Sequence, residues 1–325
     1  MFNKKERIQV GLKTAGIHHI TAFARDPQGN VDFYAGVLGL RLVKRTINFD
    51  APEVYHLYFG NEEGSPGTII TFFPWPESRK GRVGGGQVGI TAYAIPKGAM
   101  SFWEERLSRL GIETERNERF GEQSLQFSDN EGLRLELVER EGGRASSWSF
   151  DGITPDKAIK GFAGAVLYSL KPEETIAALQ HVFGFLRIGE DGQYARFQAE
   201  GDIGNVIDVP LTPVPAGNGG AGTVHHIAWR AKDYEEHEAW RQTVEQSGYV
   251  PTPIVDRQYF NAVYFREGGG ILFEIATDPP GFARDEAPEA LGEKLMLPEW
   301  FEPHREAIEA NLQPIEVRKP QEVKR

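Results

Sequence analysis

Short runs of apolar and β-branched residues recur along the chain, and each is followed by a stretch whose apolar residues return every three to four positions. The first pattern predicts strands and the second predicts amphipathic helices with one buried face. The four leading runs are GIHHITAFARD from Gly16, QVGITAYAI from Gln87, GFAGAVLYSL from Gly161 and TVHHIAWRAKD from Thr223. Their resemblance to one another indicates an internal repeat.

Each predicted helix is followed by further strand-like segments, the last of which begins with glycine. The helical stretches are NVDFYAGVLGL, KGAMSFWEERLSRLG, PEETIAALQHVFGF and DYEEHEAWRQTVEQSG, and the last strands are GTIITFFP, GLRLELVE, GNVIDVP and GILFEIA. The repeat therefore predicts an α+β fold of four βαβββ units over residues 16 to about 280. We expect the units to pair into two cupped, partly open β-barrels. The match of ITAFA with ITAYA and the two HHI segments argue against chance similarity.

Loops divide the repeat into two halves. A Gly- and Ser-containing stretch at residues 141–156 follows unit two, and the loop TPVPAGNGGAG at residues 212–222 separates units three and four. We predict a first domain at residues 1–145 with units one and two, a second at 157–285 with units three and four, and a Pro-interrupted, partly helical tail at 286–325.

The composition narrows the function classes. The 325 residues suffice for two domains, and no apolar run approaches the roughly 20 residues that a membrane span requires. The N-terminal MFNKKERIQVGLKTAG has basic residues but no apolar core after them, so we predict no secretory signal and a cytoplasmic location. The net charge of −11 argues against nucleic acid or an anionic membrane as the main partner.

The sequence contains no cysteine. This excludes disulfides, thiolate metal sites and cysteine nucleophiles. Any metal must therefore be held by His, Asp or Glu, with water or substrate completing its coordination.

Alignment of the four units separates a candidate metal site from the scaffold. The positions that correspond on the first strands are His19, Gly89, Gly164 and His226, and those on the last strands are Thr71, Glu136, Asp208 and Glu274. Only unit four combines histidine with a carboxylate. If units one and four face each other, His19, His226 and Glu274 converge on one metal. Units two and three should form a similar cup without metal.

Two imidazoles and one carboxylate form a donor set suited to Fe(II), with Mn(II) as an alternative. Three protein ligands leave up to three positions for a substrate and O₂. A glyoxalase-like isomerase would usually add a fourth carboxylate at the position of Thr71, where this chain has a hydroxyl. A lone strand histidine is more often structural than a ligand, but two HHI segments in related strands favour ligands. Strand alternation would send His18 and His225 to the faces opposite their neighbours.

A set of ordered motifs resembles the ring-cleaving dioxygenases of the vicinal oxygen chelate (glyoxalase/bleomycin-resistance/dioxygenase) superfamily, above all the hydroquinone-cleaving branch typified by 2,6-dichlorohydroquinone dioxygenase. The resemblance covers nearly the whole chain. The motifs are HHIT (18–21), RLVKRT (41–46), YHLYFG (55–60), GSPGTIITFFP (64–74), AIPKG (94–98), HHIAW (225–229), GGGILFEIATDPPGF (268–282) and LGEKLMLPEW (291–300).

The resemblance implies an Fe(II) ion held by His19, His226 and Glu274. It also implies catalytic roles for His225, Tyr264 and Arg257 and substrate-binding roles for His18 and Thr21. The residues fit these roles: Thr21 shares a strand face with His19, and Tyr264 would lie opposite Glu274 across a three-residue turn at 268–270. Arg257 is always cationic and could neutralise a phenolate.

We therefore expect an Fe(II)-dependent, extradiol-type ring-cleaving dioxygenase acting on a hydroquinone, or secondarily a catechol, with O₂. The expected partners are a small aromatic substrate and O₂, and self-association into a homo-oligomer is left open. A glyoxalase-like isomerase or lyase is one alternative, which Thr71 disfavours and a test of O₂ consumption would discriminate. A small-molecule-sequestering resistance protein of the same fold is another, although such proteins are commonly two-unit chains without a metal triad.

Overall fold

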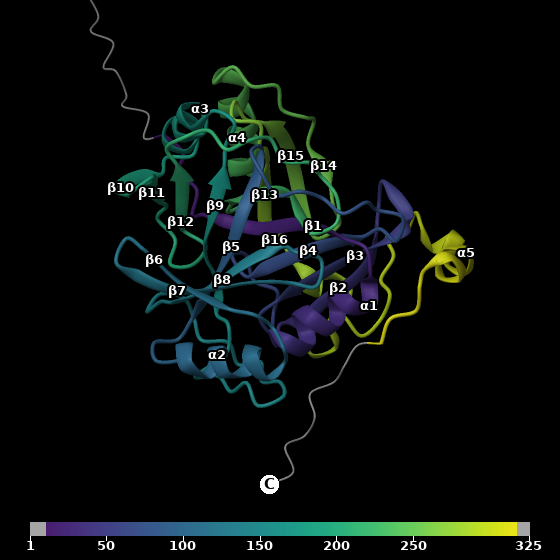
Figure 1. The fold of residues 1–325 in the computed structure, drawn as a ribbon. Coiled ribbons are helices and arrows are strands. Elements are labelled where there is room, and N and C mark those ends of the chain that lie inside the picture. The colour runs from purple at the N-terminus through teal and green to yellow at the C-terminus, as the bar shows by residue number, and fades with distance from the viewer. Residues whose placement is uncertain (1–10, 317–325) are drawn as a thin grey trace, which may run out of the picture.

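The chain forms two eight-stranded sheets, as a computed structural model that describes residues 11–316 shows (Figure 1). Residues 1–10, which contain most of the stretch predicted not to be a signal, and residues 317–325 of the predicted tail lie outside this range. Each sheet combines two of the predicted units. We call the sheet of units one and four the metal cup, after the predicted ligands His19, His226 and Glu274. We call the sheet of units two and three the arginine cup, after Arg119 and Arg196 on its strands.

The metal cup has the strand order β14-β15-β16-β13-β1-β4-β3-β2. Its strands are β1 (Ile17–Ala24), β2 (Arg41–Asn48), β3 (Ala51–Gly60), β4 (Ile69–Pro74), β13 (Thr223–Ala231), β14 (Val255–Asp256), β15 (Phe260–Arg266) and β16 (Leu272–Pro280). The first strands of units one and four, β1 and β13, are antiparallel neighbours at its centre. The predicted pairing of units one and four is thus confirmed.

The arginine cup repeats this plan with the order β10-β11-β12-β9-β5-β8-β7-β6. Its strands are β5 (Gln87–Ile95), β6 (Glu115–Arg119), β7 (Glu122–Ser128), β8 (Arg134–Glu139), β9 (Gly161–Tyr168), β10 (Leu186–Asp191), β11 (Tyr194–Gln198) and β12 (Val206–Pro210). Both sheets therefore draw strands from both halves of the sequence. The division of the chain into domains at residues 145 and 157 stays a prediction.

Helices follow the first strand of every unit, as predicted. They are α1 (Pro27–Val31), α2 (Met100–Arg109), α3 (Pro172–Ala177) and α4 (Tyr234–Gln246), with π-helical continuations at Asp32–Val37 and Ala178–Val182. A short 3-10 turn at Phe282–Arg284 follows β16, and the turns at Pro288–Ala290 and Glu302–His304 and the helix α5 (Arg305–Asn311) belong to the tail. Helix α1 begins at Pro27, earlier than the predicted Asn30, because the Asp26 side chain caps it by accepting the Gln28 N–H. No helix within residues 11–316 is long and apolar enough to cross a membrane.

Two β-bulges shape the centre of the metal cup. The pairing of β1 with β13 shifts between Ile17 and His19 and again opposite Val224 and His226, so that His18 and His225 are the extra residues. A bulge places two residues of one strand opposite one residue of its partner and breaks the alternation of faces. The rings of His18 and His19, and those of His225 and His226, therefore touch. The expectation that alternation separates each pair was wrong for this reason.

The cores of the two cups interlock through aromatic residues. Trp229 on β13 is fully buried and packs against Phe273 on β16 and against Phe183, which follows the helix of unit three, with ring centroids 5.2 and 5.4 Å apart. Large aromatic side chains contribute much of the apolar burial that stabilises a core. The helix of unit three thus supports the sheet that contains unit four.

The predicted tail docks along β2. The side chain of Lys44 is completely buried and pairs with both Asp285, at 2.6 Å, and Glu286. Arg41 donates hydrogen bonds of 2.8 Å to the main-chain carbonyls of Pro288 and Glu289. A buried ammonium requires such compensation, because an unpaired charge in the protein interior is strongly destabilising. These contacts hold the tail against unit one (Figure 1).

Candidate metal centre

Three side chains converge at the centre of the metal cup. The Nε2 atoms of His19 and His226 are 3.2 Å apart, and they lie 3.3 and 2.8 Å from Oε2 of Glu274. All three residues are buried, with Glu274 fully inaccessible to solvent. Within residues 11–316 they form the one group of three or more His, Cys, Asp or Glu side chains able to hold a metal.

The geometry of this group fits a metal ion. Donors on one face of an octahedron, each about 2.1 Å from the metal, lie about 3.0 Å apart. The observed separations of 2.8–3.3 Å match that triangle. Neither carboxylate oxygen of Glu274 accepts a hydrogen bond of ordinary geometry, although both are buried. A buried carboxylate without hydrogen bonds is unfavourable, and a bound cation would satisfy it.

The protonation states also suit metal binding. Burial alone would raise the pKa of Glu274, but His19 and His226 hold it well below its usual value. Burial lowers the pKa of His226, in spite of the opposing charge of Glu274. The group therefore presents a carboxylate and a neutral His226 imidazole at neutral pH, the forms in which these side chains ligate metals.

The neighbouring histidines fix the orientation of the ligand rings. The Nδ1 atoms of His18 and His19 are 2.9 Å apart, and those of His225 and His226 are 2.8 Å apart. A ligand that offers the Nε2 lone pair to a metal must carry its proton on Nδ1. His18 and His225 must then accept these protons at their own Nδ1 and carry hydrogen on Nε2. Burial, followed by the proximity of His19, lowers the pKa of His18 well below its usual value, which keeps it a neutral acceptor.

A pocket of about 430 Å³ opens beside the triad. The predicted catalytic residues His225, Arg257 and Tyr264 line it. Its aromatic and aliphatic wall consists of Phe23, Phe49, Phe73, Trp75, Phe260 and Leu272. Thr21 and His18 do not line this pocket; they lie beside His19, on the same strand. A mostly apolar cleft with a few polar groups suits a small aromatic molecule.

Arg257 and Tyr264 form one unit at the mouth of the pocket. Arg257 Nε donates to the Tyr264 hydroxyl at 3.2 Å, and its guanidinium carbon lies 5.4 Å from the centre of the Tyr264 ring. Although burial opposes it, the proximity of Tyr264 and of Asp50 raises the pKa of Arg257. Tyr264 is paired with Glu274 across β15 and β16, and the Glu267 N–H bonds to the Ile271 carbonyl around the three-residue turn. The predicted pairing of these two residues is confirmed.

A hydrogen-bonded chain that the sequence did not reveal lies on the pocket wall. The Tyr58 hydroxyl is 2.8 Å from His56 Nδ1, His56 Nε2 is 2.8 Å from Thr71 Oγ1, and Thr71 Oγ1 donates to Thr21 Oγ1 at 2.9 Å. Burial lowers the pKa of His56 well below its usual value, so its ring is neutral. Thr71 is thus engaged by two neighbours, at the position where a fourth carboxylate ligand would stand. No symmetry partner marks His56 in the sequence, and its role comes from a contact with Thr71 on another strand that only the fold creates.

The arginine cup places cations where the metal cup has its triad. Arg119 donates two hydrogen bonds to Glu136, at 2.8 and 2.7 Å, and one to Asp208 at 3.2 Å. Arg196 donates two more to Asp208, at 2.7 and 2.9 Å. Both acids are buried. Glu136 and Asp208 therefore have a structural role, and no metal-binding group is found at them among the described residues.

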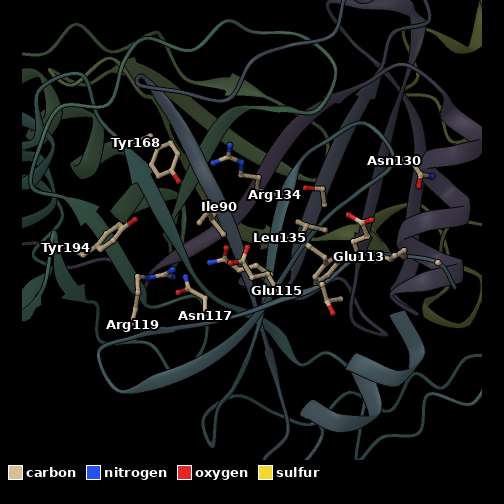
Figure 2. A pocket seen from close by; sticks show the side chains of 16 residues that line it. Ile90, Glu113, Glu115, Asn117, Arg119, Asn130, Arg134, Leu135, Tyr168 and Tyr194 are labelled. Atoms are coloured by element: carbon tan, nitrogen blue, oxygen red, sulfur yellow. The ribbon is translucent and has the colours of Figure 1, made fainter. Parts of the chain in front are cut away.

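Arg119 lies at the edge of a polar pocket of about 750 Å³ (Figure 2). Figure 2 shows Arg119 beside Asn117 and Tyr194, with Tyr168 farther up the same wall. A Cβ atom on Gly89 would come within 2.4 Å of the Tyr168 ring, and one on Gly164 within 1.9 Å of the Val206 carbonyl oxygen. Side chains are therefore sterically excluded at both glycines. The strand register places Gly164 at the position of His226, but Gly89 is the extra residue of a bulge in β5, as His18 is in β1, and Ile90 stands at the position of His19. The predicted equivalence of Gly89 with His19 was wrong by one residue, because a bulge shifts the alignment.

Comparison with known proteins agrees with this architecture. Residues 16–141 and 162–282 match the Glyoxalase/Bleomycin resistance protein/Dioxygenase superfamily. The chain is 60% identical over 306 residues to "Putative ring-cleaving dioxygenase MhqO" of Bacillus subtilis, covering 94% of this chain and 98% of that protein. It is 35% identical over 302 residues to "Chlorohydroquinone/hydroquinone 1,2-dioxygenase" of Sphingobium indicum, covering 89% and 93%. The crystal structure of a "putative dioxygenase" from Bacillus subtilis superposes with a TM-score of 0.94 at 60% identity, over 95% of this chain and 100% of that one.

Proposed function

Because the chain belongs to the glyoxalase/bleomycin resistance protein/dioxygenase superfamily and is a ring-cleaving dioxygenase, we propose that its substrate is a hydroquinone and its metal Fe(II). The observation that carries the proposal is the buried triangle of two imidazoles and one carboxylate beside an apolar, aromatic-lined pocket. This donor set suits Fe(II), with Mn(II) as the alternative. The relative named for chlorohydroquinone and hydroquinone supports the substrate class.

His19, His226 and Glu274 would hold the metal, which when bound lowers the pKa of a coordinated substrate hydroxyl and offers adjacent positions to substrate and O₂. The aromatic wall of Phe23, Phe73 and Phe260 would hold the substrate ring and exclude water. His18 would act by accepting the hydrogen bond from His19 that orients this metal ligand, rather than by contacting the substrate. Thr21 would hold Thr71 in place on the same wall.

Two groups that line the pocket, His225 and Tyr264, would act as proton donors to the substrate. Arg257 Nε–H donates to the Tyr264 oxygen, so the phenolic hydrogen is free to donate into the pocket. His225 accepts at Nδ1 from His226, so its hydrogen lies on Nε2. Either group can supply a proton as the O–O bond breaks, in the manner of general acid catalysis. Arg257 would bind the anionic substrate by its fixed charge, so Arg257→Ala should mainly weaken substrate binding.

The alternative of a glyoxalase-like isomerase or lyase is less well supported, because Thr71 offers a hydroxyl already engaged by Thr21 and His56. A small-molecule-sequestering role would not explain why the buried carboxylate of Glu274 lacks hydrogen-bond partners among residues 11–316 and lies beside two histidine nitrogens.

The test is anaerobic loading of the protein with Fe(II) or Mn(II), followed by measurement of O₂ uptake with hydroquinone, chlorohydroquinone and catechol. We expect Fe(II) protein and a hydroquinone to give the fastest uptake, with both atoms of ¹⁸O₂ in the ring-opened product. Absence of O₂ uptake with every diphenol, together with isomerisation of a thiol adduct, would support the isomerase instead.

A further inference from the structure

The β2–β3 turn of unit one reaches across the pocket mouth to unit four. Asp50 lies in this turn, and its Oδ2 accepts a hydrogen bond of 2.9 Å from Arg257 Nη1. Arg257 directly follows β14, and its Nε donates to the Tyr264 hydroxyl. We propose that Asp50 is a positioning residue that aligns Arg257, and through it the Tyr264 hydroxyl, for the reaction. This proposal rests on the proposed function.

Two anchors determine how the Arg257 guanidinium lies. Within residues 11–316, the side-chain hydrogen bonds found for it run to Tyr264 and Asp50. The guanidinium is a planar fork, so hydrogen bonds at two different nitrogens fix its plane as well as its position. Tyr264 alone would leave the group free to rotate about the Nε contact. Asp50 therefore supplies the second constraint from the opposite side of the mouth.

The turn that carries Asp50 is itself held in place. The main-chain N–H of Asp50 donates a hydrogen bond of 3.0 Å to Oδ1 of Asn48. The neighbouring Phe49 packs against two aromatic rings of the tail, Trp300 and Phe301, at centroid distances of 5.9 and 6.3 Å. Such a local Asx-type bond and aromatic packing restrict the turn. The carboxylate of Asp50 is thus presented to Arg257 by a defined scaffold rather than by a freely moving loop.

The ion pair also has a charge consequence. The Asp50 side chain is 72% exposed, whereas that of Arg257 is 21% exposed. An exposed carboxylate is screened by salt, so the hold on Arg257 should weaken as ionic strength rises. Removal of Asp50 would also leave the positive charge of Arg257 fully available to an anionic substrate. Loss of alignment should therefore lower turnover without weakening substrate binding.

The experiment compares Asp50→Asn with Glu53→Gln, which removes an equal charge from an exposed position three residues along the same hairpin. Metal content, kcat for hydroquinone, anaerobic Kd for hydroquinone and the response to NaCl are measured for both variants and the wild type. Asp50→Asn should lower kcat about tenfold, less than the ~100-fold that a 1 Å misplacement of a reacting group can produce. Its Kd should be equal or tighter. Salt should lower kcat of the wild type and of Glu53→Gln but hardly that of Asp50→Asn.

A readout independent of turnover is the ¹⁵N–¹H signal of Arg257 Nε, assigned by its disappearance in Arg257→Lys. We expect a resolved, slowly exchanging signal in the wild type and in Glu53→Gln and its loss in Asp50→Asn. Persistence of this signal in Asp50→Asn, or a kcat within twofold of Glu53→Gln, would overturn the proposal. A fall in kcat matched by loss of metal or by weaker substrate binding would overturn it too, because it indicates a general structural effect.

The two proposals fail in different ways. If the metal-loaded wild type takes up no O₂ with any diphenol, the proposed function is wrong and Asp50 has no turnover to align. If the wild type turns over hydroquinone but Asp50→Asn behaves as Glu53→Gln does, only the positioning role is wrong.

Discussion

The metal cup and the arginine cup share one architecture but neutralise their buried acids differently. In the metal cup, Glu274 lies between two histidine nitrogens, and its oxygens lack hydrogen bonds of ordinary geometry. In the arginine cup, Glu136 and Asp208 are saturated by the guanidinium groups of Arg119 and Arg196. A guanidinium group neutralises the acids of the arginine cup permanently and leaves no place for a metal ion. A buried acid without such a partner can bind a metal ion and so form a reactive centre. The comparison shows how a repeated scaffold can assign stability to one copy and chemistry to the other.

The largest effect is expected from Glu274, the buried acid that has no arginine partner among the described residues. Glu274→Gln should remove metal binding and O₂ uptake together, because two imidazoles and a neutral amide hold Fe(II) poorly. The metal-free variant should unfold at the same temperature as the metal-free wild type or at a higher one, since an unsatisfied buried carboxylate is lost. Metal analysis, O₂ uptake and thermal unfolding decide this. A variant that keeps its metal, or whose metal-free form is strongly destabilised, would contradict the distinction between the two cups.

The next effect concerns tyrosines that line the two pockets. Tyr264→Phe should retain metal and fold but lower turnover by about 10²–10⁴-fold, the range typical for a lost proton donor. His225→Ala should behave in the same way. Tyr194→Phe, which alters a pocket tyrosine of the arginine cup, is the matched control and should turn over at the wild-type rate. Wild-type turnover in both Tyr264→Phe and His225→Ala would exclude these groups as the donor.

A stability effect should appear in the arginine cup. Glu136→Gln leaves Arg119, only 12% exposed, with one carboxylate fewer. Breaking a buried ion pair costs about 3–5 kcal/mol, and the partial access of Arg119 to the pocket places the expectation near the lower end, about 3 kcal/mol. Chemical denaturation measures it. Glu104→Gln, which breaks the exposed pair with Arg116, should change stability little. Equal effects of the two substitutions would show that the buried cluster is not a structural substitute for a metal.

The smallest effect tests the close packing at Gly89, the bulge residue of β5. Gly89→Ala would force the Tyr168 ring to move and should cost about 1–3 kcal/mol, as overpacking usually does. Gly36→Ala is the control, since a Cβ there meets nothing within 4 Å and a helical alanine tends to stabilise. Both are measured by denaturant unfolding, and metal content should stay at one ion per chain in each. A neutral Gly89→Ala would mean that the cup could accept a side chain at this position.

Periodicity alone predicted the four units, their pairing and the convergence of His19, His226 and Glu274. These predictions succeeded because the repeat makes equivalent positions visible, and equivalent positions share one place in the fold. The register supports the alignment of units one and four: Thr71 lies opposite Thr21 on β1, and Glu274 lies opposite Ala228 on β13. In unit two the alignment was one residue off, because Glu136 lies opposite Ala92 and Gly89 is the extra residue of a bulge.

Features that depend on tertiary geometry could not be predicted in this way. Alternation assigned His18 and His225 to the wrong faces, because a bulge is set by the pairing of two distant strands. Asp50 and His56 were overlooked for a related reason: their importance comes from partners on other strands, Arg257 and Thr71. The internal cation was also missed, since Arg119 lies in the exposed-looking sequence ERNER.

The antiparallel pairing of β1 with β13 has a consequence for how the protein folds during translation. The two ligand histidines are separated by 207 residues. At translation rates of ~5–20 residues per second, His226 is synthesised about 10–40 s after His19. During this interval β1 can pair with β4 on one side, while the edge of β1 that later pairs with β13 stays unpaired. Long-range pairing of this kind is slow to form and leaves strands open to association with other chains. The centre can therefore acquire its metal only after nearly all of the chain has emerged.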